Sequence, residues 1–382
     1  MKSKKTFDAL HVVLISITHM VHDIFSSFLA PILPLLIEKL AMTYTMAGFL
    51  VVAQRLPALL NPCIGVLADK NNLRYFVIAA PSVTTVSMCL LGVAPSYTVL
   101  VSLLLIMGLG SVMFHVPSPV MIRQLAGEQV GKGMSFYMLG GEIARTLGPL
   151  VILGAVSLWG LEGIWRLIPF GLLSSVILFF KMRNMEITNG NHGDPVLTSG
   201  IGKTLMEFLP LLATLAGMVF FQAFMKGALI TFLPTYITVR GGSLWFGGIS
   251  LVILQCAGAA GTLAAGILSD RIGRKKVLII ALSLSPLSML LFTFASSFFV
   301  APMLILLGLT VFALDPVILA IVNERKNDHP SFVNGTYMMI SFFVAALTIV
   351  LTGQMADLLG LEMTYRIAAV IALLSIPCAA RL

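Results

Sequence analysis

Charged side chains are scarce in this sequence. Asp, Glu, Lys and Arg together make up 10% of its 382 residues, whereas 58% of the residues are hydrophobic. A soluble globular domain carries about 25% charged residues, and the mean hydropathy here is +1.00. So few charges could not keep this much apolar surface in water. The composition therefore excludes a soluble globular protein and leaves a lipid bilayer as the solvent.

Cysteine and the common catalytic motifs are also scarce. The sequence has no phosphate-binding loop, no H-E-x-x-H motif and no recognisable Ser/His/Asp arrangement. These absences argue against direct use of ATP and against a membrane hydrolase, so we predict a protein that is not an enzyme and needs no cofactor. Four cysteines stand in apolar segments without C-x-x-C spacing, and we expect buried free thiols at Cys63, Cys89, Cys256 and Cys378.

Apolar runs recur at lengths that suit a membrane, since a transmembrane helix needs about 20 mostly apolar residues. The runs fall at residues 9–37, 45–67, 75–95, 98–122, 134–159 and 164–182, and then at 206–237, 244–268, 276–298, 300–322, 332–356 and 364–380. We predict an all-α integral membrane protein with twelve transmembrane helices in two six-helix bundles. The bundles are residues 1–182 and 204–382, joined by a polar cytoplasmic linker at 183–203.

The distribution of cations predicts the orientation of the chain in the membrane. If the amino terminus is inside, 17 of the 24 Lys and Arg fall on the cytoplasmic side, four fall outside and three fall within spans. We therefore expect both termini in the cytoplasm of a bacterial inner (plasma) membrane, and a monomer. The formal net charge of +8 fits the anionic lipid headgroups, and no lysine-rich run with interleaved aromatic residues indicates nucleic-acid binding.

The two halves of the sequence resemble each other. A shift of about 200 residues superposes seven pairs in the same order: Pro34 and Pro234, Gly48 and Gly248, Gln54 and Gln255, Gly65 and Gly266, Asp69 and Asp270, Gly108 and Gly308, and His115 and Asp315. Such a duplication predicts two parallel six-helix repeats around a central cavity, with a substrate near the middle of the membrane.

One cytoplasmic loop motif occurs in both halves. Glycine allows helices to approach closely, and an aspartate there can meet a helix amino terminus or an arginine. The pattern resembles the loop motif of the major facilitator superfamily, which implies a gating role. Its members are Gly65, Asp69 and Arg74 in the first half, and Gly266, Asp270, Arg271, Gly273, Arg274 and Lys275 in the second.

Motifs of the first half resemble a narrower family. His19-Met20-Val21-His22-Asp23 is similar to the H-x-x-N-D motif of the fosmidomycin-resistance family, with His22 in place of the usual Asn. Phe114-His115 and Gly140-Gly141 continue the match, which covers residues 15–155. Gly148-Pro149 also resembles the end of an antiporter-associated motif that favours close helix packing. The resemblance implies a proton-driven exporter of a small molecule such as a drug or a phosphonate.

Six ionisable side chains fall inside the expected spans, where a charge needs a partner, a wet cavity or a function. They are the cations Arg55, Arg145 and Lys226 and the carboxylates Asp23, Glu142 and Asp315. The helical rise places Asp23 and Arg55 about 22 and 21 Å from the cytoplasmic boundary, but His115 only about 12 Å from it. Glu142 and Arg145 are three residues apart and share a helix face.

We interpret the carboxylates as proton-coupling groups, Asp23 first and Glu142 second, with contributions from His115 and Asp315. The cations would attract an anionic group of the substrate. The substrate-binding set is completed by other polar side chains: His19, His22, Gln222 and Gln255. A structural alternative is that Asp23–Arg55 and Glu142–Arg145 are permanent ion pairs that hold the helices in register.

The predicted function is that of a secondary active transporter that works by alternating access. The proton gradient would drive efflux of a drug or of an anionic or amphipathic compound. Proton-coupled uptake of an organic anion is one alternative. Export of a transition metal is another, because His19, Asp23 and His115 could ligate a metal ion; the main prediction includes no metal.

Overall fold

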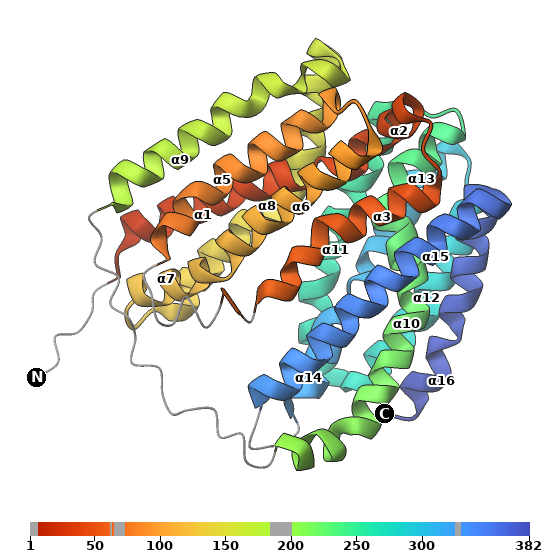
Figure 1. Cartoon of the computed structure of the whole chain (residues 1–382). Coiled ribbons are helices and arrows are strands. Elements are labelled where there is room, and N and C mark those ends of the chain that lie inside the picture. Colours follow the sequence, from red (N-terminus) through yellow and green to blue (C-terminus); the bar gives the residue numbers. More distant parts are fainter. Residues whose placement is uncertain (1–6, 62, 65–72, 184–200, 325–329) are drawn as a thin grey trace, which may run out of the picture. The chain divides into compact units, whose positions relative to one another are not determined.

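The computed structural model describes residues 7–61, 63–64, 73–183, 201–324 and 330–382 (Figure 1). All its regular elements in these ranges are helices. The first half contains α1 Ala9–Ser26, α2 Leu29–Leu40, α3 Tyr44–Arg55, α5 Arg74–Cys89, α6 Tyr97–His115, α7 Pro117–Leu125, α8 Val130–Trp159 and α9 Ile168–Met182. The second half contains α10 Ile201–Val239, α11 Leu244–Ile272, α12 Arg274–Phe294, α13 Ser297–Val311, α14 Leu314–Glu324, α15 Pro330–Leu373 and α16 Ser375–Ala380.

The described helices account for twelve membrane spans. Ten stretches are long and apolar enough to cross a membrane. One of them, Thr336–Ala380, contains two helices that meet at Gly360. The φ of Gly360 is 78°, which favours glycine and ends the first of the two helices. The shorter apolar stretch Tyr44–Leu60 stands where the second span was predicted. The all-α, multi-pass prediction is therefore confirmed.

The chain forms two compact units. Unit 1 comprises Met1–Met42 and Leu50–Gly193, and unit 2 comprises Thr43–Phe49 and Asp194–Leu382. The division after Gly193 falls within the predicted linker, of which residues 184–200 lie outside the described ranges. The sequence prediction did not anticipate that the first part of α3 groups with unit 2.

The duplication is visible in the packing inside each unit. In unit 1, Gly108 of α6 lies so close to the Gln54 carbonyl oxygen that a Cβ atom would be 2.5 Å from it. In unit 2, Gly308 of α13 lies against the Leu254 carbonyl oxygen in the same way. The helices that follow the first span of each half also begin alike, because the hydroxyls of Thr43 and Ser243 each accept a hydrogen bond from the amide three residues on.

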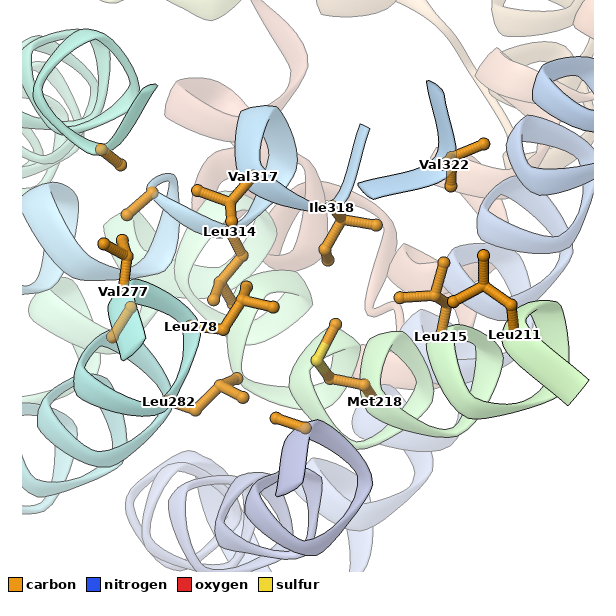
Figure 2. Packing of buried hydrophobic residues seen from close by; sticks show 14 of the residues in the cluster. Leu211, Leu215, Met218, Val277, Leu278, Leu282, Leu314, Val317, Ile318 and Val322 are labelled. Atoms are coloured by element: carbon orange, nitrogen blue, oxygen red, sulfur yellow. The ribbon is translucent and has the colours of Figure 1, made fainter. Parts of the chain in front are cut away.

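Each unit has its own apolar core. In unit 2, Leu211, Leu215 and Met218 of α10 meet side chains from α12 and α14 (Figure 2), among them Val277, Leu278, Leu282, Leu314, Val317 and Ile318. In unit 1, the core gathers residues of α1, α5, α6, α7, α8 and α9, among them Val12, Val77, Phe114, Met121, Tyr137 and Leu178. Large apolar side chains also remain exposed, such as Phe170, Phe180, Leu287 and Leu291. Lipid is the natural solvent for them.

The cysteines are free thiols in the structure, but the expectation that all four are buried was wrong. Cys89 is buried and Cys378 is half-buried, whereas Cys63 and Cys256 are exposed. The physical reason is that apolar residues of a membrane helix need not point into the protein, because the acyl chains on the other side are equally apolar.

Close contact between α1 and α8 depends on glycine. A Cβ atom at Gly140 would collide with the Ser16 carbonyl oxygen, and one at Gly148 would lie 2.8 Å from the Ile24 carbonyl oxygen. Gly154, further along α8, has nothing within 4 Å of its hypothetical Cβ. Gly140 and Gly148 therefore let α8 lie directly against α1, on which the candidate site is built.

We predict that Gly148→Val destabilises the protein by about 1–3 kcal/mol, because the added side chain overfills the α1–α8 contact. This should lower the Tm of the purified protein in detergent by about 2–4 °C for each kcal/mol. The matched variant Gly154→Val carries the same change in helix propensity and should leave the Tm close to that of the wild type. Equal losses in both variants would contradict the packing argument.

Candidate functional site

A group of polar side chains lies inside unit 1 where α1, α6 and α8 meet. His19, His22 and Asp23 form one stripe of α1, because residues three and four apart share a helix face. His115 is the last residue of α6, and Tyr137 stands in the second turn of α8. We call His19, Asp23 and His115 the triad.

In the triad, one carboxylate stands between two imidazoles. Asp23 Oδ2 is 3.2 Å from His19 Nε2, and Asp23 Oδ1 is 3.2 Å from His115 Nε2. The side chains of His19 and Asp23 are only 7% and 14% exposed, whereas that of His115 is 37% exposed. His115 is thus the most exposed member of the triad.

Tyr137 orients both imidazoles through their other ring nitrogens. His19 Nδ1 is 2.7 Å from the Tyr137 carbonyl oxygen, and His115 Nδ1 is 3.3 Å from the Tyr137 hydroxyl. The phenol ring also stacks on the His19 imidazole, with centroids 4.0 Å apart. The hydroxyl of Ser118 on α7 lies 2.9 Å from the Tyr137 hydroxyl and donates to the Phe114 carbonyl oxygen at 2.6 Å.

The remaining neighbours of the triad are apolar or unpaired. His22 is fully buried and stacks on Phe114, with ring centroids 4.9 Å apart. Neither of its ring nitrogens has a hydrogen-bond partner among the described residues. Gly141 leaves room beside the triad, because a Cβ there would lie 2.8 Å from His19 Cε1 and 3.5 Å from Asp23 Oδ2. Bulky or polar groups are thus kept away from the carboxylate.

The depth estimate was wrong in setting His115 in a different layer from Asp23. The Asp8 amide donates to the Leu125 carbonyl oxygen at 2.9 Å, so α1 begins beside the end of α7 and runs antiparallel to α6 and α7. Cβ atoms tilt towards the amino terminus of their helix. The Asp23 side chain therefore leans towards the start of α1 and that of His115 leans towards the start of α6, which closes the gap.

The predicted alternative of an Asp23–Arg55 ion pair is corrected by the same geometry. The Asp23 oxygens contact His19 and His115 instead. Arg55 ends α3 with an exposed side chain, and no carboxylate in the described ranges lies within ion-pair distance of it. Asp23 and Arg55 do not pair although their estimated depths are nearly equal, because the Asp23 side chain extends along α1 away from the level of its own Cα atom.

Two other ion pairs involve charged groups within spans. Arg145 Nη1 is 3.1 Å from Glu142 Oε1 on the shared face of α8. Lys226 Nζ of α10 is 2.6 Å from Asp315 Oδ2 of α14 and lies 5.3 Å from the ring centroid of Phe312. The sequence did not indicate that Lys226 and Asp315 meet. These pairs are at least partly exposed, unlike the core of the triad.

The two predicted glutamines differ in their surroundings. Gln222 is buried, and its amide donates to the Ala372 carbonyl oxygen at 3.2 Å and to the Ser375 hydroxyl at 2.8 Å. These bonds connect α10 to α15 and α16 and stabilise the packing of unit 2. Gln255 is half-buried on α11.

The second copy of the loop motif forms a network at one end of unit 2. Arg274 lies 2.6 Å from Asp270 and 2.9 Å from Glu324, so it connects the α11–α12 junction to the end of α14. Gly273 separates the two helices with a φ of 97°. Lys275 donates to the Ala380 carbonyl oxygen, while Arg271 is exposed and Gly266 lies within α11. In the first copy, Arg74 begins α5, but Gly65 and Asp69 lie outside the described residues.

The triad could hold a metal ion, since one ligand atom from each residue lies within 4.8 Å of the other two. However, each imidazole faces its own oxygen of Asp23. Each of these contacts is also short enough for a proton to be shared between its two atoms. The residues that sequence reasoning missed are Tyr137 and Ser118, which carry no charge. One available signal was that Tyr137 recurs 200 residues later as Tyr337.

Known proteins resemble the whole chain. The Fosmidomycin resistance protein of Escherichia coli (strain K12) is 25% identical over 377 residues, which cover 98% of this chain and 92% of that protein. An uncharacterized MFS-type transporter of Bacillus subtilis (strain 168), YfnC, is 22% identical over 92% of this chain and 88% of its own length.

Solved structures share the fold at low sequence identity. An inward-facing, unoccupied bacterial homolog of the human lysosomal transporter Spinster has a TM-score of 0.80 and 16% identity, covering 100% of this chain and 96% of that one. The nucleoside transporter NupG has a TM-score of 0.75 and 16% identity, covering 97% and 98%. A D-xylose-proton symporter has a TM-score of 0.73 and 14% identity, covering 97% and 96%.

A sequence profile gives the family directly. The profile described as Major Facilitator Superfamily matches residues 15–270 and 248–382. The twelve spans, the duplicated units and the transporters that share the fold agree with this match. The chain is therefore a membrane transporter and not an enzyme, and it belongs to the Major Facilitator Superfamily.

Proposed function

We propose that this transporter is an antiporter that exports a small anionic or amphipathic molecule in exchange for protons. The observation that carries the proposal is the largely buried Asp23 carboxylate between His19 and His115 in a membrane span. The likeness to a protein named for fosmidomycin resistance supports export, because removal of a toxic compound is one way to resist it.

The triad has the chemistry of a proton-coupling site. Its imidazole and carboxylate groups can bind and release protons, and each proton taken up from water or released to water changes the charge of the site by one unit. In a medium of low dielectric, such a change alters the free energy of the surrounding conformation strongly. A conformational change that opens His115 to water on one side of the membrane or the other would therefore load or unload protons.

The exposed cations support an anionic substrate group. A charged side chain in contact with acyl chains at mid-span is unfavourable by about 2.5–3.5 kcal/mol or more, so we place Arg55, Arg145 and Lys226 against water. Arg145 and Lys226 already have the acidic partners Glu142 and Asp315. Arg55 has none within the described part of the chain, and its guanidinium matches a carboxylate or phosphonate. We therefore assign Arg55 the first contact with the substrate.

The proposed cycle is alternating access, in which units 1 and 2 change their arrangement around a substrate bound at mid-membrane. The proton gradient supplies the energy, the transporter acts as a monomer in a bacterial inner membrane, and both termini are cytoplasmic. The Arg274 network would then stand at the cytoplasmic end of unit 2, where it can stabilise one state of the cycle.

Two alternatives predict different transport results. Proton-coupled uptake of an organic anion, as the D-xylose-proton symporter fold allows for a sugar, would move the substrate inwards with protons. Export of a transition metal through the triad would make cells sensitive to that metal when the gene is deleted. The vesicle experiment below tests the direction of transport, and the metal sensitivity of a deletion strain tests metal export.

Replacing Asp23 should uncouple transport from the pH gradient. In inside-out membrane vesicles with an acidic lumen, the wild type should accumulate radiolabelled fosmidomycin or another anionic antibiotic. Asp23→Asn should abolish this pH-driven accumulation, because the amide cannot carry the exchanged charge, yet exchange without a gradient should persist. Glu207→Gln alters an exposed acid and serves as the control. An Asp23→Asn protein with the accumulation and pH dependence of the wild type would refute the assignment.

Replacing Arg55 should weaken the binding of an anionic substrate. Arg55→Gln should raise the concentration of an anionic substrate for half-maximal transport by about tenfold or more, the loss expected for one charge-assisted hydrogen bond. Arg55→Lys should recover part of this loss, because it keeps the charge but not the planar fork. Arg183→Gln changes an exposed arginine that follows α9 and should leave the half-maximal concentration unchanged. If Arg55→Gln binds anions as well as the wild type does, Arg55 is not the contact.

Reporter fusions should show the orientation of the chain in the membrane. A green fluorescent protein fused after Leu382 should fluoresce, and alkaline phosphatase fused there should be inactive, because both reporters would lie in the cytoplasm. Alkaline phosphatase inserted between Arg240 and Ser243 should be active, since this turn follows the first span of unit 2. The reverse pattern of activities would overturn the proposed topology.

A further inference from the structure

We infer that the triad binds two exchangeable protons, one in each contact of Asp23 with an imidazole. Tyr137 and Ser118 are the positioning residues whose hydrogen bonds set the number of protons at two. The inference deepens the proposed function, on which its meaning for transport rests. It follows from the directions of the hydrogen bonds around the triad, which can be traced from two backbone carbonyls.

The first chain of hydrogen bonds begins at the Phe114 carbonyl oxygen, which can only accept a hydrogen bond. Ser118 donates its single hydroxyl hydrogen to this oxygen at 2.6 Å. Its oxygen must therefore accept the hydrogen of Tyr137 in the 2.9 Å contact between the two hydroxyls. Tyr137 has then no hydrogen left for His115, so its oxygen accepts from His115 Nδ1 at 3.3 Å. His115 consequently carries a hydrogen on Nδ1.

The second hydrogen bond to follow ends at the Tyr137 carbonyl oxygen. It lies 2.7 Å from His19 Nδ1 and can only accept, so His19 also carries a hydrogen on Nδ1. A neutral imidazole has one hydrogen on its two nitrogens. If His19 and His115 were both neutral, their Nε2 atoms would therefore be bare lone pairs.

Each Nε2 atom lies 3.2 Å from an oxygen of Asp23. Oδ1 is buried and receives no hydrogen bond of normal geometry from the described residues, His115 included. A lone pair facing a carboxylate oxygen at this distance is repulsive unless a proton lies between them. Each contact thus requires one proton, whichever of its two atoms carries it. The proposed loaded state therefore holds two protons.

The charge of the triad changes with this loading. With two protons it is +1, with one it is neutral, and with none it is −1. The other titratable groups that face the triad in the described structure are His22 of α1 and Tyr137 of α8. Neither offers an acidic counter-charge at the triad. Full loading and full unloading therefore both leave a net charge in the core of unit 1.

Exposure gives the two protons an order. His115 is 37% exposed, whereas His19 is 7% exposed and is covered by the Tyr137 ring. The proton between Asp23 and His115 therefore exchanges with water first, and the proton between Asp23 and His19 follows through Asp23. The coupling ratio in transport would be at most two protons for each substrate molecule.

The test is nitrogen NMR of the purified full-length protein labelled with ¹⁵N-histidine, which reports the protonation of each ring nitrogen separately. The chain has six histidines, and His19→Gln and His115→Gln identify the two resonances of interest. At acidic pH both rings should show the imidazolium pattern. As the pH rises, His115 should lose its Nε2 hydrogen before His19 does, and both neutral rings should retain the hydrogen on Nδ1.

Three conservative variants separate the positioning role from a merely structural one. Tyr137→Phe removes the acceptor for His115 but keeps the backbone carbonyl for His19, so only the His115 tautomer should become mixed. Ser118→Ala frees the Tyr137 hydrogen to point at His115 Nδ1, so neutral His115 should carry its hydrogen on Nε2 and the triad should need one proton fewer. Asp23→Asn should move the titration of both rings to lower pH.

A wild-type His115 whose neutral form carries the hydrogen on Nε2 would overturn the inference. So would titrations of His19 and His115 that do not respond to Asp23→Asn. Each variant should keep the Tm and gel-filtration elution of the wild type, which shows that the spectra report the triad and not unfolding. If the spectra agree with the inference but transport in vesicles does not depend on the pH gradient, the triad binds two protons and the proposed proton-coupled export is wrong.

Discussion

The neutralisation of one largely buried carboxylate constrains most of what surrounds it in unit 1. Asp23 is only 14% exposed where α1, α6 and α8 meet, and an unpaired charge there would be strongly unfavourable. His19 and His115 provide the compensation, and their rings are held in place by the backbone and hydroxyl of Tyr137. The small residues Gly140, Gly141 and Gly148 let α8 come close enough to bring Tyr137 there.

The two units share an origin but not a chemistry. At the positions of His19 and Asp23, unit 2 has Val219 and Ala223, and its core is a continuous apolar cluster (Figure 2). The charged groups of unit 2 are displaced to the partly exposed pair of Lys226 and Asp315. The duplication thus supplied two similar frameworks, and the triad stands in unit 1. The proposed division of work assigns protons to unit 1 and leaves unit 2 free to contribute charge to the substrate.

Local features of the sequence predicted the fold well, and non-local contacts were harder to predict. The spans follow from the length of the apolar runs, and Glu142 and Arg145 meet because their spacing is helical. The contact of Asp23 with His115 depends on the opposite tilts of side chains on antiparallel helices, which a count of residues along each helix ignores. Ser118 and Tyr137 lack charge and gave little signal, although their hydroxyls contact each other and Tyr137 contacts His115 Nδ1.

The most direct test of the central claim is a count of the protons that the triad releases. Purified wild-type protein and the variant His19→Gln/Asp23→Asn/His115→Gln would be titrated side by side in detergent between acidic and alkaline pH, and the difference between the two curves taken. The account predicts that, over this range, the wild type releases two protons per molecule more than the variant, in two steps. Steps of proton release that stay at the same pH when Asp23→Asn is introduced alone would contradict it, because Asp23 would then be neutralised by something other than the protons shared with His19 and His115.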